Sequence, residues 1–337
     1  MYKHTPSPSN TGDEQNFLTY PGGPTLAAFF VAPPQGSLNY AFVVAPRNQT
    51  QGRSLQLRKE SIWTSPHIPV LLNEVIKVLD AKEGEFFIDG TFGAGGHSAA
   101  IKEKIGVSGK LLTIDWDKTG ENFADLPEIL KRKNLLKADG LLLDLGFSSE
   151  QLSTGRGFSF QKNEPLLMTY DINAKPAKEI LKELSKEELE RIIGEYSQER
   201  FAERIAGEIK AREKIKPIET TQELVDVIKK AVPKNYERGR IHPATRTFMA
   251  LRIYANRELE NLEEVLKNIE NILKPGGRIA IISFHSLEDG LVKNYFRKYA
   301  TEGKMKILTK KPIIASREEI ANNPRSRSAK LRAAQIL

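Results

Sequence analysis

Four short runs of consecutive apolar residues stand out along the chain, and each ends in a carboxylate or a hydroxyl group. The runs lie in residues 86–89, 110–115, 140–144 and 277–283. Uninterrupted Leu, Ile and Phe, without alternation with polar residues, is typical of strands covered on both faces, and therefore of a parallel sheet. Ligands bind at the carboxyl ends of the strands in such sheets. We therefore expect the terminal side chains to share one edge of the sheet: Asp89, Asp115, Asp144 and Ser283.

The pattern between the third and fourth runs has the period of a helix instead. Residues 174–237 are dense in Lys, Glu, Ile and Leu at helical spacing, and Ser185 with Glu188 predicts a capping box. We expect a small inserted helical domain, residues 165–238, which either forms one wall of a ligand cleft or only covers the sheet. A long helix over 244–273 is then expected to return the chain to the sheet. Its predicted core positions are Phe248, Leu251, Leu259, Leu262, Leu266 and Ile269.

The turn after the first run is rich in glycine and leads into a segment suited to a helix. Residues 89–98 follow the pattern Asp-x-x-x-Gly-x-Gly-Gly, and glycine lets a backbone lie against a ligand. This spacing suits S-adenosylmethionine better than a dinucleotide, because the methionine part of that cofactor brings no pyrophosphate to bind. Asp115 follows the glycines by about 20 residues, where a carboxylate can accept both ribose hydroxyls. A turn that only joins a strand to a helix is the alternative.

Several longer segments carry a more specific resemblance. They are residues 67–72, 89–98, 143–152, 156–160, 241–252, 283–289 and 323–332. Together they resemble the bacterial small-subunit ribosomal RNA cytosine-N4 methyltransferase family (RsmH, also called MraW), over about residues 67–332. The resemblance implies a class I S-adenosylmethionine-dependent methyltransferase with a Rossmann-like, mostly parallel α/β sheet, formed by residues 65–160 and 240–337.

The same resemblance implies a reaction and a set of cofactor contacts. The reaction is methyl transfer to the exocyclic N4 of one cytidine in 16S rRNA, near the decoding centre, by a cytoplasmic enzyme that acts on the small ribosomal subunit. Whether the enzyme forms a homodimer stays open. The helical insertion would be a wall of the RNA cleft. The cofactor contacts implied by position are Gly95, Gly96, His97, Asp115, Phe123, Asp144 and Gln151.

The chemistry of cytosine indicates what the catalytic residues must do. The N4 lone pair is delocalised into the ring, so the amine is a poor nucleophile that must be positioned while its protons are accepted. Asp144, Ser148 and His285 are the candidates for this work. His285 is either a proton acceptor or a packed histidine that bonds the backbone. No metal ligand set is assigned.

Composition narrows the alternatives. The chain has no cysteine. This excludes cytosine C5 methylation through a thiolate adduct, radical chemistry on an iron–sulfur cluster, and zinc sites built on cysteine. It also excludes disulfides, which fits a reducing cytoplasm. The apolar runs are too short to span a membrane, so no membrane partner is expected.

Positive charge is concentrated at the carboxyl-terminal end. The net charge is +8, and residues 291–337 hold twelve Lys and Arg against three Asp and Glu. We interpret this tail as an arm that contacts RNA phosphates, whereas a merely solvated tail is the alternative. The expected RNA-binding residues are Arg240, Arg246, Arg252, Arg325, Arg327 and Lys330.

Two features depart from the family pattern. Asp115 and Phe123 are only eight positions apart, so a helix and an edge strand of the sheet are expected to be missing and strand 110–115 to become an exposed edge. Leu167 stands where the family has an acid. An RNA-binding relative with impaired cofactor binding is therefore an alternative function, and a nucleotide-dependent oxidoreductase is another.

The first 64 residues resemble nothing recognisable. They are rich in Pro, Gly, Ser, Asn and Gln, and their short apolar pieces are broken by proline. No basic segment precedes an apolar one in the way that a secretory signal requires. We expect residues 1–64 to be disordered or a spurious extension.

Overall fold

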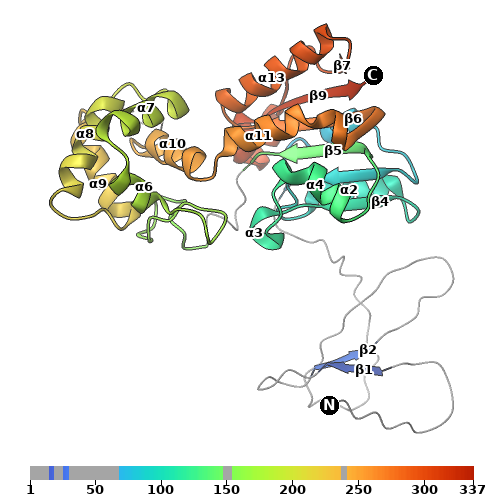
Figure 1. Ribbon diagram of the computed structural model, residues 1–337, viewed down its shortest axis with the longest axis horizontal. Helices are drawn as coiled ribbons and strands as arrows, with labels where there is room; N and C mark the ends of the chain where they lie inside the picture. The colour runs from blue at the N-terminus through green and yellow to red at the C-terminus, as the bar shows by residue number, and fades with distance from the viewer. Residues whose placement is uncertain (1–14, 19–25, 30–67, 147–153, 237–240) are drawn as a thin grey trace. The chain divides into compact units, whose positions relative to one another are not determined.

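The computed structural model describes residues 68–146, 154–236 and 241–337, together with the backbone of two strands near the N-terminus (Figure 1). Those strands, β1 (Gln15–Leu18) and β2 (Leu26–Phe29), pair antiparallel within a unit formed by residues 1–60. The rest of the segment expected to be disordered lies outside the described residues. A second compact unit, residues 61–337, holds everything that follows.

A seven-stranded sheet forms the centre of this unit, and the four apolar runs supply four of its strands, as predicted. The order is β4-β3-β5-β6-β9-β7, with β8 paired to β9. The first four of these are parallel, whereas β9 runs antiparallel to β6, β7 and β8. The strands are β3 (Phe86–Asp89), β4 (Lys110–Thr113), β5 (Ala138–Asp144), β6 (Leu273–Ser283), β7 (Met305–Ile307), β8 (Ile313–Ile314) and β9 (Lys330–Ile336).

Helices cover both faces of the sheet, which explains why the strands are apolar throughout. Neighbouring residues on β5 point to opposite sides: Leu142 packs with α1 (Leu72–Leu79) and α2 (Gly96–Ile105), whereas Leu141 and Leu143 pack with the helices of the other face. Those are α4 (Leu126–Arg132), α11 (Glu258–Lys267), α12 (Ile269–Ile272) and α13 (Ser286–Thr301). Strand β4 is an edge of the sheet, as predicted.

Between β5 and α11 the chain forms a group of helices (Figure 1). These helices have a hydrophobic core of their own. The helices are α6 (Ala177–Glu183), α7 (Lys186–Ser197), α8 (Ala202–Glu213), α9 (Thr221–Ala231) and α10 (Thr245–Ala255). Ser185 and Glu188 form the predicted capping box at the start of α7, and Thr220 with Glu223 forms another before α9. Each box satisfies backbone N–H groups that the first helical turn leaves without partners.

The single long helix expected over 244–273 is wrong. The chain forms α10, α11 and α12 instead, and Arg257 takes a left-handed backbone conformation (φ 50°) between the first two. Asn256 explains the break. Its side chain accepts the N–H of Tyr170 (2.8 Å) and donates to the carbonyl of Met168 (2.7 Å), so it ties a neighbouring segment to the end of α10. Of the predicted core positions, Leu259 is only half-buried; the others are buried.

The interpretation of the carboxyl-terminal end as an arm or a solvated tail is also wrong for its last residues. Residues 330–336 form β9, which lies inside the sheet between β6 and β7, and its residues Leu331, Ala333 and Ala334 are fully buried. Lys330 and Arg332 both pair with Asp289. Before this strand come α14 (Arg317–Asn322) and the short helix η2 (Pro324–Ser328), where Arg325 and Arg327 are exposed.

Candidate functional site

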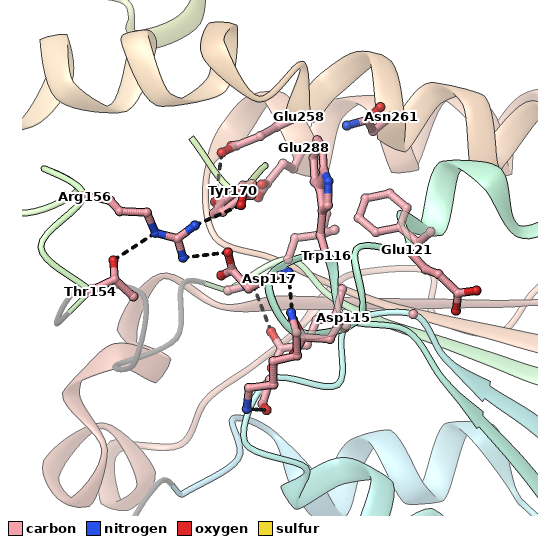
Figure 2. A pocket seen from close by; sticks show the side chains of 18 residues that line it. Asp115, Trp116, Asp117, Glu121, Thr154, Arg156, Tyr170, Glu258, Asn261 and Glu288 are labelled. Carbon is pink, nitrogen blue, oxygen red and sulfur yellow. Dashed lines mark hydrogen bonds and ion pairs between the residues drawn. The ribbon is translucent and has the colours of Figure 1, made fainter. Parts of the chain in front are cut away.

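A cavity of about 330 Å³ opens at the carboxyl ends of β3, β4 and β5 (Figure 2). The residues that follow these strands line it, as expected for a parallel sheet. The segment after β5 and the start of α11 complete the wall. The lining residues are Gly90, Thr91, Gly93, Asp115, Trp116, Asp117, Lys118, Glu121, Phe123, Asp144, Leu145, Gly146, Thr154, Arg156, Tyr170, Glu258, Asn261 and Glu288.

The glycine turn after β3 shapes the floor of this cavity. Gly93 has a positive φ (51°), and a Cβ built there would meet no atom closer than 3.8 Å, so open space adjoins its backbone. Gly95 caps α2 in a left-handed conformation, and a Cβ on Gly96 would lie 2.4 Å from Pro69 Cγ. The described lining residues do not include Gly95, Gly96 and His97, which the sequence predicted as cofactor contacts. Instead, Gly96 packs against Pro69, and His97 bonds the backbone of Val70.

Buried polar contacts join this turn to the ends of β3 and β5. Ser98 Oγ donates to Asp89 Oδ2 (2.6 Å), and the backbone N–H of Thr91 donates to Asp89 Oδ1 (3.1 Å). Burial raises the pKa of Asp89 despite these bonds. Thr91 Oγ1 in turn accepts the backbone N–H of Asp144 (2.6 Å). The contacts fix where the Asp144 carboxylate enters the cavity.

Asp115 and Phe123 meet at the cavity although the segment between them is short. Asp115 caps α3 (Trp116–Thr119): its Oδ1 accepts the N–H of Asp117 (3.0 Å) and of Lys118 (3.1 Å), while burial raises its pKa. Gly120, with φ 69°, ends this helix, and the short helix η1 (Phe123–Asp125) begins at once. Eight positions are therefore enough to bring both residues into one wall.

Several residues of the site were not predicted from the sequence. Arg156 bridges Asp117 and the backbone after β5, and the Tyr170 ring lies beside that of Trp116 (centroids 5.6 Å apart). Arg156 and Glu288 stood in recognised segments without an assigned role. Tyr170 carried no signal, because only the fold brings its segment to the cavity. Glu258 accepts the Tyr170 hydroxyl (3.1 Å).

His285 is the N-cap of α13. Its Nδ1 accepts the backbone N–H of Glu288 (3.5 Å), and its Nε2 lies 3.0 Å from Glu288 Oε1. The backbone bond is the one expected of a packed histidine. Among the described residues, Glu258, His285 and Glu288 also bring three potential metal-ligand atoms within 4.8 Å. A metal ion bound to these atoms would meet the Arg252 guanidinium, whose Nε lies 2.8 Å from Glu258 Oε1, so we assign none.

The remaining predicted residues are less easily grouped. Ser148, Gln151 and Arg240 lie outside the described residues. Arg246, on α10, donates to the Tyr236 hydroxyl (3.0 Å) and lies 4.0 Å from Glu199. Arg252 is mostly buried and paired with Glu258; burial alone would lower the pKa of the guanidinium, but the Glu258 carboxylate raises it. Lys330 pairs with Asp289 at 3.3 Å.

Comparison with known proteins decides the family. Residues 64–337 match the model of the MraW methylase family. The chain belongs to that family. A "Ribosomal RNA small subunit methyltransferase H" of Trichlorobacter lovleyi is 44% identical over 307 residues, covering 80% of this chain and 98% of the relative. The protein of that name from Thermotoga neapolitana is 44% identical over 298 residues, covering 82% and 97%.

A solved structure, a SAM-dependent O-methyltransferase from Thermotoga maritima, is 12% identical with a TM-score of 0.29, covering 78% of this chain and 63% of that one. This similarity is too weak to add to the assignment. Membership of the MraW methylase family identifies the chain as a methyltransferase and supports S-adenosylmethionine as its cofactor. It leaves no support for the nucleotide-dependent oxidoreductase.

The cavity fits this cofactor. Asp115 offers a carboxylate for a ribose diol, and Trp116 and Phe123 offer aromatic rings for an adenine. Open space beside the Gly93 backbone gives a ligand room to approach closely. No helix in the described part of the chain is long and apolar enough to cross a membrane.

Proposed function

We propose that the chain methylates the exocyclic N4 of a cytidine in the 16S rRNA of the small ribosomal subunit, near the decoding centre, with S-adenosylmethionine as methyl donor. The observation that supports this proposal most directly is the cavity at the carboxyl ends of β3, β4 and β5, which is lined by Asp115, Phe123 and Asp144. The name of the relatives, which refers to ribosomal RNA of the small subunit, supports the substrate class.

The chain's own groups would bind the cofactor at both ends of this cavity. Asp115 Oδ1 is engaged in capping α3, so Oδ2 is the oxygen that would accept the ribose hydroxyls. Phe123 would lie against the adenine. When bound, S-adenosylmethionine supplies a methyl group activated on a positively charged sulfur. The glycine turn would leave room for its methionine end, while His97 and Gly96 hold the turn in place.

Asp144 is the residue that we propose acts on the acceptor amine. Its carboxylate lies at the cavity, with Oδ1 accepting the N–H of Gly146 (3.1 Å) and Oδ2 3.6 Å from His97 Nδ1. A carboxylate held there would accept a hydrogen bond from the N4 amine, orient its lone pair, and take up a proton as positive charge develops on nitrogen. His285 caps α13 in a capping box with Glu288, so we propose that it supports the cavity wall at the start of this helix and does not move a proton.

RNA would approach over the basic surfaces outside the cavity. Arg325 and Arg327 are exposed on η2, and Arg246 lies on α10 in the helical segment. We propose the helical region, residues 165–238, as one wall of the RNA cleft. Arg252 and Lys330 are less suited to phosphate contact, because Glu258 and Asp289 already pair with them.

A second candidate is an RNA-binding relative with weakened cofactor binding. The observation that favours it is the exposed edge of β4 beside the short segment between Asp115 and Phe123. The alignment with the Trichlorobacter lovleyi relative is 307 positions long, but it includes only 80% of this 337-residue chain. Because 80% of 337 is fewer than 307, the relative has stretches that this chain lacks.

Transfer of a labelled methyl group from S-adenosylmethionine to purified small-subunit RNA tests the proposal, and calorimetric titration of the cofactor separates the candidates. Micromolar binding, about −8 kcal/mol, together with label in RNA supports the methyltransferase. RNA binding by a folded chain that takes up no cofactor supports the second candidate instead.

A further inference from the structure

One arginine joins two walls of the cavity that lie far apart in the sequence (Figure 2). Arg156 Nη2 lies 2.7 Å from Asp117 Oδ1, in the helix that follows the ribose-binding position. Its Nη1 donates to the carbonyls of Thr169 (3.1 Å) and Tyr170 (2.9 Å), and its Nε to Thr154 Oγ1 (3.2 Å). A guanidinium is planar and presents several donors in fixed directions, so it holds a carboxylate and a backbone segment in one geometry.

The two segments that Arg156 joins each carry an aromatic ring. Trp116 lies between Asp115 and Asp117 on α3, and its ring centroid is 5.6 Å from that of Tyr170. The Tyr170 ring also stacks on Phe158 at 5.3 Å. Both Trp116 and Tyr170 line the cavity.

Tyr170 is held from its other end as well. Its hydroxyl donates to Glu258 Oε1 (3.1 Å), and Arg252 Nε lies 2.8 Å from the same oxygen. The backbone N–H of Tyr170 donates to Asn256 (2.8 Å). Burial raises the pKa of Tyr170 well above its usual value, so the hydroxyl stays protonated and keeps donating at neutral pH. The ring is thus fixed from the start of α11, and Arg156 fixes the Trp116 side against it.

We propose that Arg156 is a positioning residue for the cofactor: by bridging Asp117 to residues 169–170, it holds Trp116 and Tyr170 as one aromatic wall of the cofactor cavity. The inference rests on the proposed cofactor site. Because Asp115 and Asp117 flank Trp116 on a helix of a single turn, the same bridge also fixes the direction of the ribose-binding carboxylate. Cofactor affinity then depends on a segment outside the glycine turn, at the entrance to the helical region.

The chain offers a matched control at the opposite end of the sheet. Arg278 is as buried as Arg156 (side chains 27% and 25% exposed) and makes the same kinds of contact, with Asp80 at 3.1 Å and with the carbonyl of Val78 at 3.1 Å. It lies beside Lys274 and Asp139, near the amino ends of β5 and β6. Replacing it removes an equivalent bridge without touching the cavity.

The test is calorimetric titration of S-adenosylmethionine into the full-length chain and into Arg156→Gln, Arg156→Lys and Arg278→Gln, with thermal unfolding of each. We expect Arg156→Gln to raise the cofactor Kd at least about tenfold, which is the usual effect of losing a charged hydrogen bond. Arg156→Lys should fall between, because it keeps the charge and loses the fork. Arg278→Gln should leave the Kd unchanged. In methylation assays, Arg156→Gln should raise the KM for the cofactor while saturation restores kcat.

Asp117→Asn measures the coupling. If Arg156 acts through Asp117, the double variant should bind no worse than Arg156→Gln alone, whereas independent effects would multiply. Should Arg156→Gln not fold, Arg156→Lys and Asp117→Asn carry the test. Equal Kd values for these variants and the unsubstituted chain, with only the unfolding midpoint lowered, would show that the bridge merely stabilises the fold. Failure of the unsubstituted chain to bind the cofactor would instead overturn the proposed function.

Discussion

His97 Nδ1 lies 3.6 Å from Asp144 Oδ2, while its Nε2 lies 2.9 Å from the backbone carbonyl of Val70. The carbonyl can only accept, so Nε2 donates the hydrogen bond to it. The buried ring therefore lies between the backbone of Val70 and the Asp144 carboxylate at the end of β5. The geometry gives Asp144 a fixed place at the cavity, where the acceptor amine would arrive.

Removing the Asp144 carboxylate should therefore stop catalysis without preventing RNA binding. We expect Asp144→Ala to lower kcat by at least about 100-fold, the usual contribution of a positioned acid or base, with the RNA Kd within about twofold. Asp139→Asn, at the other end of β5, is the matched control and should keep its activity. Methyl transfer and RNA binding are measured on the same preparations; substantial turnover by Asp144→Ala would remove this residue from the mechanism.

The raised pKa of Asp115 predicts that cofactor binding weakens in acid. Burial disfavours the carboxylate, so its pKa in the folded chain lies above the ordinary value of 3.8, and the ribose hydroxyls need the ionised form. Affinity should fall by up to about tenfold per pH unit once the pH drops below that pKa. The effect on the free energy of unfolding has the opposite sign. A raised pKa favours the folded state at low pH, and this stabilisation is lost as the pH rises through the raised pKa of Asp115.

Titration of the cofactor between pH 4 and pH 8, with circular dichroism to confirm folding, checks this dependence. Asp115→Asn should bind weakly at every pH, because its side chain does not titrate. An unsubstituted chain whose affinity stays flat across the window would mean that Asp115 does not contact the ribose.

Trp116 provides a spectroscopic report on the cavity. The chain has two tryptophans, so Trp63→Phe leaves Trp116 as the single tryptophan, which can be excited selectively over the tyrosines. Addition of S-adenosylmethionine should change the emission of Trp116, because an adenine would stack on its ring or the ring would move closer to Tyr170. The cofactor concentration at the midpoint of this change should equal the calorimetric Kd. Phe123→Ala should shift that midpoint to higher concentration. A signal that is unchanged while heat is released would place the cofactor away from Trp116.

Arg325 and Arg327 should carry part of the RNA affinity. Each phosphate contact that is lost reduces the slope of log K against log salt by about 0.7–0.9, so Arg325→Gln with Arg327→Gln should lower the slope by about 1.5 and weaken binding most at low salt. Lys82→Gln with Lys274→Gln removes the same charge from exposed side chains near the amino ends of the strands, and should change neither quantity. Equal slopes for both pairs would show that η2 does not touch RNA.

Truncation is a poor test of the same surface, because it removes more than charge. Deleting residues 330–337 takes away β9, which pairs with β6 on one side and β7 on the other. We expect such a chain not to fold, and unfolding would mask any effect of Arg325 and Arg327.

The parallel sheet could be predicted because its evidence is local. A strand buried on both faces must be apolar throughout, and its carboxyl end must carry whatever polar group serves a ligand, so Asp89 and Asp144 were visible in the sequence. Ser185 and Glu188 were visible for the same reason, since a capping box spans only four positions.

The errors concern residues whose role depends on distant partners. Asn256 ends a helix because Met168 and Tyr170 need its side chain, and nothing near Asn256 in the sequence shows this. Lys330 and Arg332 are basic, yet Asp289 pairs with them inside the sheet. A charge pattern alone does not distinguish an exposed arm from an inner strand whose cations are paired. Tyr170 was not predicted either, because only the fold brings its segment to the cavity.

The most direct test is the identity of the methylated nucleoside. Small-subunit RNA that lacks the modification is incubated with the chain and S-adenosylmethionine, digested, and analysed by mass spectrometry against nucleoside standards, with Asp144→Ala as control. We predict N4-methylated cytidine with the unsubstituted chain and none with the variant. A methyl group found on cytosine C5 or on a ribose hydroxyl, or RNA left unmodified by a chain that binds the cofactor, would contradict the account.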